Sequence, residues 1–264
     1  MTVSIGEAGR VAGTHDLIPD GDRVVKRYRS WDRGEHVREW TMLRAAAPHL
    51  PGVVPRPLAH DLRADPPWIA MTRLAGDPMG GALSGPQLDA LEVALRRLWS
   101  VPVDGLPPRR LHPAEAREVI GGGLAAAPRP GGTVGRAYDV CMAHLASTGP
   151  RGRPVLGHGD ANLANYLWDG ATVRLVDFED GGVSTVEDEL AFLAEHLAGR
   201  ATDWEPFVSR FDTDPSRLRS ARLTCAAHWL LLLLPGGPAA ERNPPGALEE
   251  QARRILTLSL RGRP

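Results

Sequence analysis

The sequence predicts an α+β protein with a small N-terminal β-sheet lobe, which carries one helix, and a larger helical C-terminal lobe. Three observations lead to this fold class. Short runs of strand-forming residues dominate the first 75 of the 264 residues, and long segments of helical character dominate the remainder. A glycine-rich stretch at residues 76–85 separates the two parts and would form a hinge. We therefore expect lobes at residues 1–75 and 76–264.

The expected N-terminal lobe is built from short strands around a single helix. The sequence Pro-Asp-Gly-Asp at residues 19–22 predicts a hairpin turn. Asp32 is expected to cap a helix over residues 32–47, which Pro48 would end. The expected strands are residues 3–5, 10–18, 23–29, 56–61 and 68–74.

The expected C-terminal lobe is mainly helical, with short strands inside it. Proline- and glycine-rich linkers at residues 101–113 and 128–132 separate its first helices. The expected strands are residues 155–158, 166–168 and 173–178. The expected helices are residues 86–99, 113–126, 134–146, 186–199, 203–211, 215–234 and 245–260.

Composition and charge exclude several classes of protein. No apolar run approaches the roughly 20 residues that span a bilayer, and the N-terminus has no signal-peptide pattern, so we expect a cytoplasmic protein without a membrane partner. Two cysteines give neither a disulfide framework nor a zinc site. Residues 155–205 hold 11 acidic and 2 basic residues, which suits a divalent cation and argues against nucleic acid as a partner.

The stretch from Leu156 to Glu179 contains the residues that phosphoryl transfer needs. That reaction requires a carboxylate to accept the proton of the attacking hydroxyl, and hard oxygen ligands to hold Mg²⁺ against nucleotide phosphates. Asp160 would be the carboxylate that accepts the proton, and Asn165 and Asp177 would be the oxygen ligands of Mg²⁺. The Asp-x-x-x-x-Asn spacing is that of the protein-kinase catalytic loop, and Asp177-Phe-Glu stands where Asp-Phe-Gly would follow it.

With His158-Gly-Asp160, Asn165 and Asp177-Phe-Glu179 together, the chain resembles the aminoglycoside phosphotransferase family, a group of small-molecule kinases in the protein-kinase-like superfamily. The resemblance covers most of the chain. It implies a bilobal kinase-like fold whose N-terminal lobe binds ATP or GTP, with Mg²⁺, and whose C-terminal lobe holds the catalytic and substrate sites. It also implies that Asp160 is the catalytic base and that Asn165 and Asp177 are the metal ligands.

The resemblance extends into the N-terminal lobe, where it concerns nucleotide binding. Lys26 is the only lysine among the 31 basic residues, and it resembles the lysine that binds the nucleotide phosphates. Glu39 would be its partner, although Glu35, one helical turn earlier, is also a candidate. We expect replacement of Lys26 to leave the fold intact, as for an ammonium at a strand edge.

The nucleotide base is expected against the backbone just after the strand at residues 68–74, because a purine edge needs an exposed main-chain donor and acceptor. The residues expected there are Met71, Thr72 and Leu74. No Walker motif is present, so the chain is not a P-loop enzyme. Residues 6–13 are the only candidate for a glycine-rich loop over the phosphates.

The acceptor is expected to be a small molecule with a hydroxyl group, such as an antibiotic or natural product, with aminoglycosides as the example. The alternatives are a housekeeping kinase of an amino alcohol or sugar, and a pseudokinase-like module that binds nucleotide without transferring phosphate. A metal-dependent hydrolase is excluded, because no second His/Asp cluster would complete its metal site. We expect the acceptor pocket to be lined by residues 82–99, 114–138 and 188–204.

Overall fold

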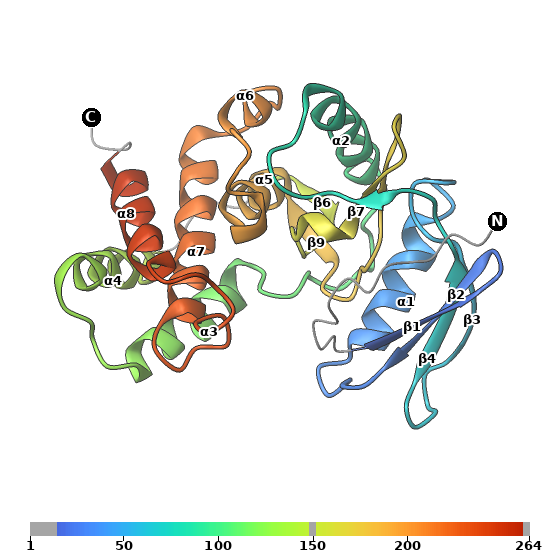
Figure 1. Ribbon diagram of the computed structural model, residues 1–264, viewed down its shortest axis with the longest axis horizontal. Coiled ribbons are helices and arrows are strands. Elements are labelled where there is room, and N and C mark those ends of the chain that lie inside the picture. Colours follow the sequence, from blue (N-terminus) through green and yellow to red (C-terminus); the bar gives the residue numbers. More distant parts are fainter. Residues whose placement is uncertain (1–14, 148–151, 261–264) are drawn as a thin grey trace.

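A four-stranded antiparallel sheet forms the N-terminal lobe at one end of the molecule (Figure 1). The computed structural model describes residues 15–147 and 152–260. The sheet has the order β1-β2-β4-β3. Its strands are β1 (His15–Asp20), β2 (Arg23–Tyr28), β3 (Pro57–Asp61) and β4 (Trp68–Thr72). The expected strand at residues 3–5 and the glycine-rich loop at residues 6–13 lie outside the described residues.

Strand β2 is a central strand rather than an edge strand. Lys26 pairs with Leu17 of β1 on one side and with Ile69 of β4 on the other. Lys26 and Tyr28 alternate with exposed Arg27, so both side chains lie on the buried face of the strand. The sheet therefore directs the single lysine of the chain inward.

Helix α1 (Glu35–Ala46) packs beside the sheet and begins later than predicted. Its N-cap is Gly34, with φ of 74°, a left-handed conformation that glycine adopts without steric cost. Asp32 instead accepts a hydrogen bond from the Ser30 hydroxyl at 2.8 Å, so the predicted cap at Asp32 is wrong. Met42 and Leu43 of this helix are fully buried.

Two small β-ribbons lie where the lobes meet. Strand β5 (Asp77–Pro78) pairs with β7 (Tyr166–Trp168), which pairs with β8 (Val173–Leu175), while β6 (Pro154–Gly157) pairs with β9 (Gly182–Thr185). Neither β5 nor β9 was predicted from the sequence. The predicted strand over residues 173–178 ends at Leu175, which leaves Asp177 in a loop after β8.

Helices make up most of the C-terminal lobe. Helix α5 ends at Glu195, because His196 leaves the helical conformation and a 3₁₀ turn at Leu197–Gly199 follows, and α6 is only one turn long. Both are therefore shorter than predicted. The helices are α2 (Gly85–Leu98), α3 (Pro113–Ala126), α4 (Gly132–Leu145), α5 (Val186–Glu195), α6 (Glu205–Val208), α7 (Pro215–Leu233) and α8 (Ala247–Leu260).

Two large hydrophobic cores hold these elements together. The first runs across both lobes and includes Leu43 of α1, Leu95 of α2 and Phe178, all fully buried or nearly so. The second lies among α3, α4, α7 and α8, at the end of the molecule opposite the sheet (Figure 1), and includes Leu124 and Ile255. Among the described residues, no helix has both the length and the hydropathy to cross a membrane. The shared first core fixes the sheet against the loops that follow β6 and β8.

Candidate active site

Lys26 lies at the centre of a cluster of carboxylates drawn from both lobes. Its Nζ is 2.6 Å from Oε2 of Glu39, 2.6 Å from Oδ1 of Asp177 and 3.0 Å from Oε2 of Glu179. The lysine is only 2% exposed. Burial lowers the pKa of Lys26, but the three carboxylates outweigh it, so the pKa lies above its usual value and the ammonium stays charged.

Glu39 is the α1 residue that pairs with Lys26. Its Oε2 also accepts a hydrogen bond from the Tyr28 hydroxyl at 2.5 Å, and its side chain is almost fully buried. Burial raises the pKa of Glu39 despite the contact with Lys26. Glu35, the other candidate partner, instead accepts a hydrogen bond from Nε of Arg33 at 2.7 Å. The structure therefore brings Lys26 together with Glu39 and not with Glu35.

Asp177 and Glu179 reach the lysine from the loop after β8. Asp177 has φ of 69°, a conformation that is uncommon outside glycine and that recurs at functional sites. Burial raises the pKa of Asp177, but Lys26 outweighs it and the pKa is lowered. Burial raises the pKa of Glu179 to about 7, with Asp177 and Glu39 contributing in the same direction. From the sequence, Glu179 could either line the metal or substrate site or cap the following loop, and the structure brings its carboxylate to Lys26.

Asp160 lies on the loop that follows β6, and two donors orient its carboxylate. The Asn165 side-chain amide donates to Oδ2 at 2.8 Å, and the Asn162 backbone N–H donates to Oδ1 at 2.9 Å. The side chain is still 36% exposed, so a solute can reach it. The predicted pair of Asp160 and Asn165 is thus in direct contact.

Fully buried His158 ties this loop to the segment that carries Asp177. Its ring nitrogens lie 2.7 Å from the carbonyl oxygen of Asp160 and 2.8 Å from that of Val176. Its backbone N–H donates to Glu189 of α5 at 2.8 Å. Because both ring nitrogens face backbone oxygens, His158 acts as a structural link between the two loops.

The oxygen atoms around these loops suit a divalent cation. Oxygens of Glu39, Asp177 and Glu179 lie within 4.8 Å of one another, and all three carboxylates contact the Lys26 ammonium. The Asn165 amide nitrogen donates to Asp160, which leaves the amide oxygen for a cation. The Asn165 carbonyl accepts from Val176 N–H at 3.0 Å, which places Asn165 beside the residue that precedes Asp177. Carboxylate and amide oxygens of this kind fit Mg²⁺.

His196 lies beside Asp160. Its Nε2 lies 4.0 Å from Oδ1 of Asp160. Its Nδ1 accepts a hydrogen bond from Ala198 N–H at 3.1 Å, so Nε2 carries the proton of the neutral ring. Burial lowers the pKa of His196 and favours that neutral form. A lone histidine at a helix end carries no distinctive sequence signal, so His196 was not predicted.

Main-chain groups after β4 differ in their availability. Thr72 N–H donates to Arg56 O at 3.0 Å, and Arg73 N–H donates to Asp22 O at 2.8 Å, so both of these donors are engaged. Met71 is buried, whereas Leu74 is partly exposed and its N–H has no hydrogen-bond partner within residues 15–147 and 152–260. Of the three residues predicted to contact the base, Leu74 offers the available donor.

Solved structures of similar fold come from the kinase-like group. A choline/ethanolamine kinase family protein from Mesorhizobium loti matches with a TM-score of 0.66 and 19% identity, over 96% of this chain and 89% of the other. The GDP complex of aminoglycoside 2'-phosphotransferase-IIIa matches with a TM-score of 0.62 and 17% identity, over 97% and 92%. Choline kinase LicA from Streptococcus pneumoniae matches with a TM-score of 0.63 and 14% identity, over 97% and 92%. These matches confirm the predicted kinase-like fold.

A family model matches most of the described chain, whereas no curated protein matches this sequence. The model of the phosphotransferase enzyme family matches residues 15–227, a span that contains the Lys26 cluster as well as the Asp160 and Asp177 loops. With the family match and the kinase-like fold in agreement, the chain belongs to the phosphotransferase enzyme family.

Proposed function

We propose that this protein transfers the γ-phosphate of ATP or GTP to a hydroxyl group of a small molecule. One observation carries the proposal. Asp177, which contacts Lys26 at 2.6 Å, and the Asp160–Asn165 pair lie on neighbouring loops that His158 joins through two backbone oxygens, and Lys26 in turn contacts Glu39. Phosphoryl transfer requires a positively charged side chain that binds the phosphates and oxygen ligands that hold a metal ion. It also requires a carboxylate that accepts the proton of the acceptor hydroxyl.

The roles follow from the charges and contacts of each side chain. Lys26 would hold the nucleotide phosphates, since its ammonium remains charged and Glu39 fixes its position at 2.6 Å. Asn165 and Asp177 would hold Mg²⁺ through the amide oxygen and the carboxylate. When bound, Mg²⁺ supplies positive charge that offsets the charge of the phosphates.

Asp160 would orient the acceptor hydroxyl and accept its proton. The hydroxyl oxygen attacks the γ-phosphorus, the bond from that phosphorus to the bridging oxygen breaks, and the proton passes to Asp160. Its carboxylate is partly exposed and held by Asn162 and Asn165, so it needs little reorganisation before the reaction. His196, whose Nε2 lies 4.0 Å from the same carboxylate, would limit the space in which it can rotate.

We place the nucleotide base at the main chain of Leu74, where an unengaged N–H follows β4. The GDP complex of the aminoglycoside phosphotransferase supports a purine nucleotide as the donor. For the acceptor we propose a hydroxylated natural product, antibiotics included. The pseudokinase alternative is disfavoured, because Lys26, Glu39, Asp160, Asn165 and Asp177 are all present and a degenerate module loses one or more of them.

The test is a nucleotide-consumption screen of the purified chain with ATP or GTP and Mg²⁺. The acceptor panel should contain antibiotics, nucleosides, amino alcohols and sugars, and mass spectrometry should detect the phosphorylated product. Asp160→Asn is the matched control, since it keeps the shape of the side chain and removes the base. Product formed equally well by Asp160→Asn, or no product from any acceptor class, would contradict the proposal.

A further inference from the structure

The Tyr28 hydroxyl is a buried polar group beside the Lys26 cluster. Tyr28 lies on β2, on the same face of the strand as Lys26, and is 1% exposed. Its hydroxyl donates a hydrogen bond of 2.5 Å to Oε2 of Glu39 on α1. The phenol is therefore bonded to the carboxylate that pairs with Lys26.

Two donors hold the Glu39 carboxylate. Among the described residues, Lys26 Nζ and the Tyr28 hydroxyl are the groups that donate to it, and both reach the same oxygen, Oε2, at 2.6 and 2.5 Å. Glu39 is 1% exposed, so water cannot readily replace a donor that is lost. A buried carboxylate without its donors is costly. The position of Glu39 therefore depends on both contacts.

The Lys26 ammonium has three N–H groups and three carboxylate acceptors. Its contacts are Glu39 and Asp177 at 2.6 Å and Glu179 at 3.0 Å. A nucleotide phosphate can bind this ammonium only if at least one of these contacts is given up or shared. The hydrogen bond from Tyr28 does not involve the lysine, so it still holds Glu39 when such an exchange occurs.

The aromatic ring of Tyr28 is itself held in place by its neighbours. Lys26 Nζ lies over the ring, 5.1 Å from its centroid. The ring of His36 on α1 lies 5.8 Å from it, and the ring of His15 on β1 lies 6.4 Å from it. The backbone N–H of Tyr28 donates to the Pro67 carbonyl at 3.0 Å. The hydroxyl is thus carried by a side chain that sheet and helix surround.

We propose that Tyr28 is a positioning residue for nucleotide binding, which fixes the Glu39 carboxylate so that Lys26 can contact the nucleotide phosphates while Glu39 stays in place. This inference rests on the proposed function, in which Lys26 binds those phosphates. Without the hydroxyl, Glu39 depends on Lys26 alone, and a phosphate that engages the lysine leaves a buried carboxylate short of a donor. Loss of the hydroxyl should therefore weaken the binding of nucleotide and not that of the acceptor.

The first test is Tyr28→Phe, which keeps the ring and removes only the hydroxyl. Isothermal titration calorimetry of the full chain with the Mg²⁺ salts of ATP and GTP, without acceptor, measures nucleotide affinity. We expect Tyr28→Phe to weaken that affinity by about tenfold, because a hydrogen bond to a charged group is lost.

Thr41→Val is the matched control for this variant. It removes a hydroxyl from the same helix that carries Glu39, and that hydroxyl donates to the Val37 carbonyl at 2.7 Å. Valine has nearly the shape of threonine, so the control differs from Tyr28→Phe in the acceptor that loses its donor. Thr41→Val should bind nucleotide as the native chain does.

A double variant shows whether the hydroxyl acts through Glu39. Glu39→Gln replaces the carboxylate with a neutral amide, which has no charge to be held. In that background, Tyr28→Phe should change nucleotide affinity by about threefold or less. A tenfold loss in both backgrounds would overturn the proposal, because the hydroxyl would then act independently of Glu39. The double variant also keeps the test decisive if Tyr28→Phe alone misfolds, since it removes the donor and the charge together.

Stability and kinetics separate positioning from a contribution to the fold alone. Urea unfolding compares the stability of Tyr28→Phe with that of the native chain. Lower stability with unchanged nucleotide affinity would show that the hydroxyl serves only the fold, and it would overturn the proposal. In turnover assays, a positioning role raises KM for the nucleotide and leaves KM for the acceptor unchanged. A rise in KM for the acceptor alone would contradict it.

These measurements also distinguish the role of Tyr28 from the proposed function. Nucleotide binding that weakens in Tyr28→Phe, without turnover of any acceptor, would support the role of Tyr28 and contradict phosphoryl transfer. Turnover with equal nucleotide affinity in Tyr28→Phe and the native chain would support phosphoryl transfer and contradict the role of Tyr28. If the native chain bound neither nucleotide, both proposals would fail.

Discussion

Replacing Lys26 with methionine should destabilise the fold by about 3–5 kcal/mol, the usual cost of removing one partner from a buried ion pair. Methionine is apolar and similar in length, so it removes the charge without leaving a large cavity. The lysine is 2% exposed and has three carboxylates at 2.6, 2.6 and 3.0 Å. From the sequence we expected replacement of Lys26 to leave the fold intact, on the assumption that Lys26 lies at a strand edge. The central position of β2 in the sheet contradicts that assumption.

The loss should depend on pH, because burial raises the pKa values of Glu39, Asp177 and Glu179 and Lys26 opposes that rise in all three. Without the lysine, these carboxyls have pKa values in the folded state above those in the unfolded chain. Groups of this kind favour the folded state at low pH, and that contribution disappears as the pH rises through the folded-state pKa. The destabilisation should therefore be smaller at about pH 5 than at about pH 8.

Urea unfolding followed by circular dichroism at both pH values measures this effect. The double variant Lys26→Met/Glu39→Gln is the control, since it removes the most buried carboxylate together with the lysine and should recover part of the loss. An exposed ion pair would show a loss of unfolding free energy below about 1 kcal/mol that does not vary with pH. Such a result would refute the conclusion that Lys26 stabilises the fold as part of a buried ion-pair cluster.

Other predictions concern the loops and one half-buried histidine, His228. Asp160→Asn should lower turnover by about 10²–10⁴-fold and leave nucleotide affinity little changed. Asp177→Asn should lower turnover and also weaken Mg²⁺-dependent nucleotide binding. If both variants lost nucleotide affinity equally, Asp160 would be a metal ligand. Gly159→Ala should greatly reduce turnover and lower the melting temperature, because its Cβ would lie 2.2 Å from the Asp180 carbonyl and φ is +82°; wild-type behaviour would show that the loop is pliable. Burial lowers the pKa of His228 to about 4, so folding stability should fall as the pH drops from about 6.5 to about 4, when the unfolded chain takes up the proton first. His228→Gln should remove up to about 3 kcal/mol of that fall in urea titrations, and an unchanged acid profile would contradict the assignment.

Local sequence determined the elements of this protein and the residues of its loops. Helix α3 spans Pro113–Ala126, as predicted, because proline at its start and apolar spacing along it are local signals. Asp160 and Asn165 could be assigned to one loop from their spacing of five residues, whereas the contact between their side chains is a finding of the structure. Boundaries such as the start of α1 depended on backbone geometry at Gly34, which the spacing of apolar residues does not encode.

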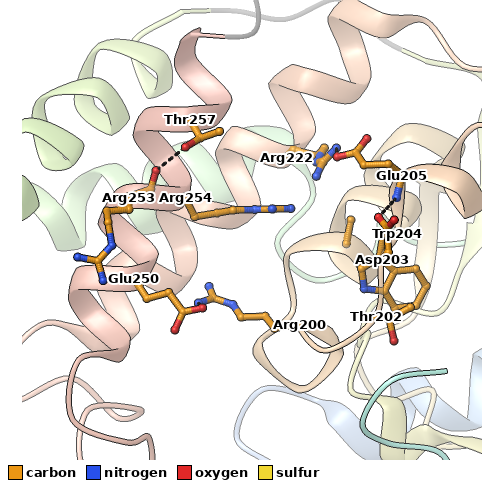
Figure 2. A pocket seen from close by; sticks show the side chains of 11 residues that line it. Arg200, Thr202, Asp203, Trp204, Glu205, Arg222, Glu250, Arg253, Arg254 and Thr257 are labelled. Atoms are coloured by element: carbon orange, nitrogen blue, oxygen red, sulfur yellow. Dashed lines mark hydrogen bonds and ion pairs between the residues drawn. The ribbon is translucent and has the colours of Figure 1, made fainter.

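Only the tertiary structure decided which side chains meet and which are buried. Lys26 and Asp177 are 151 positions apart in the chain, and their 2.6 Å contact depends on packing between the lobes. The same packing selected Glu39 over Glu35 and placed His196 beside Asp160. A cavity lined by Arg200, Arg222, Arg253 and Arg254 likewise arises where α7, α8 and the turn after α5 converge (Figure 2). Burial and charge pairing are properties of surfaces formed by distant segments, so they appear only once those segments are packed together.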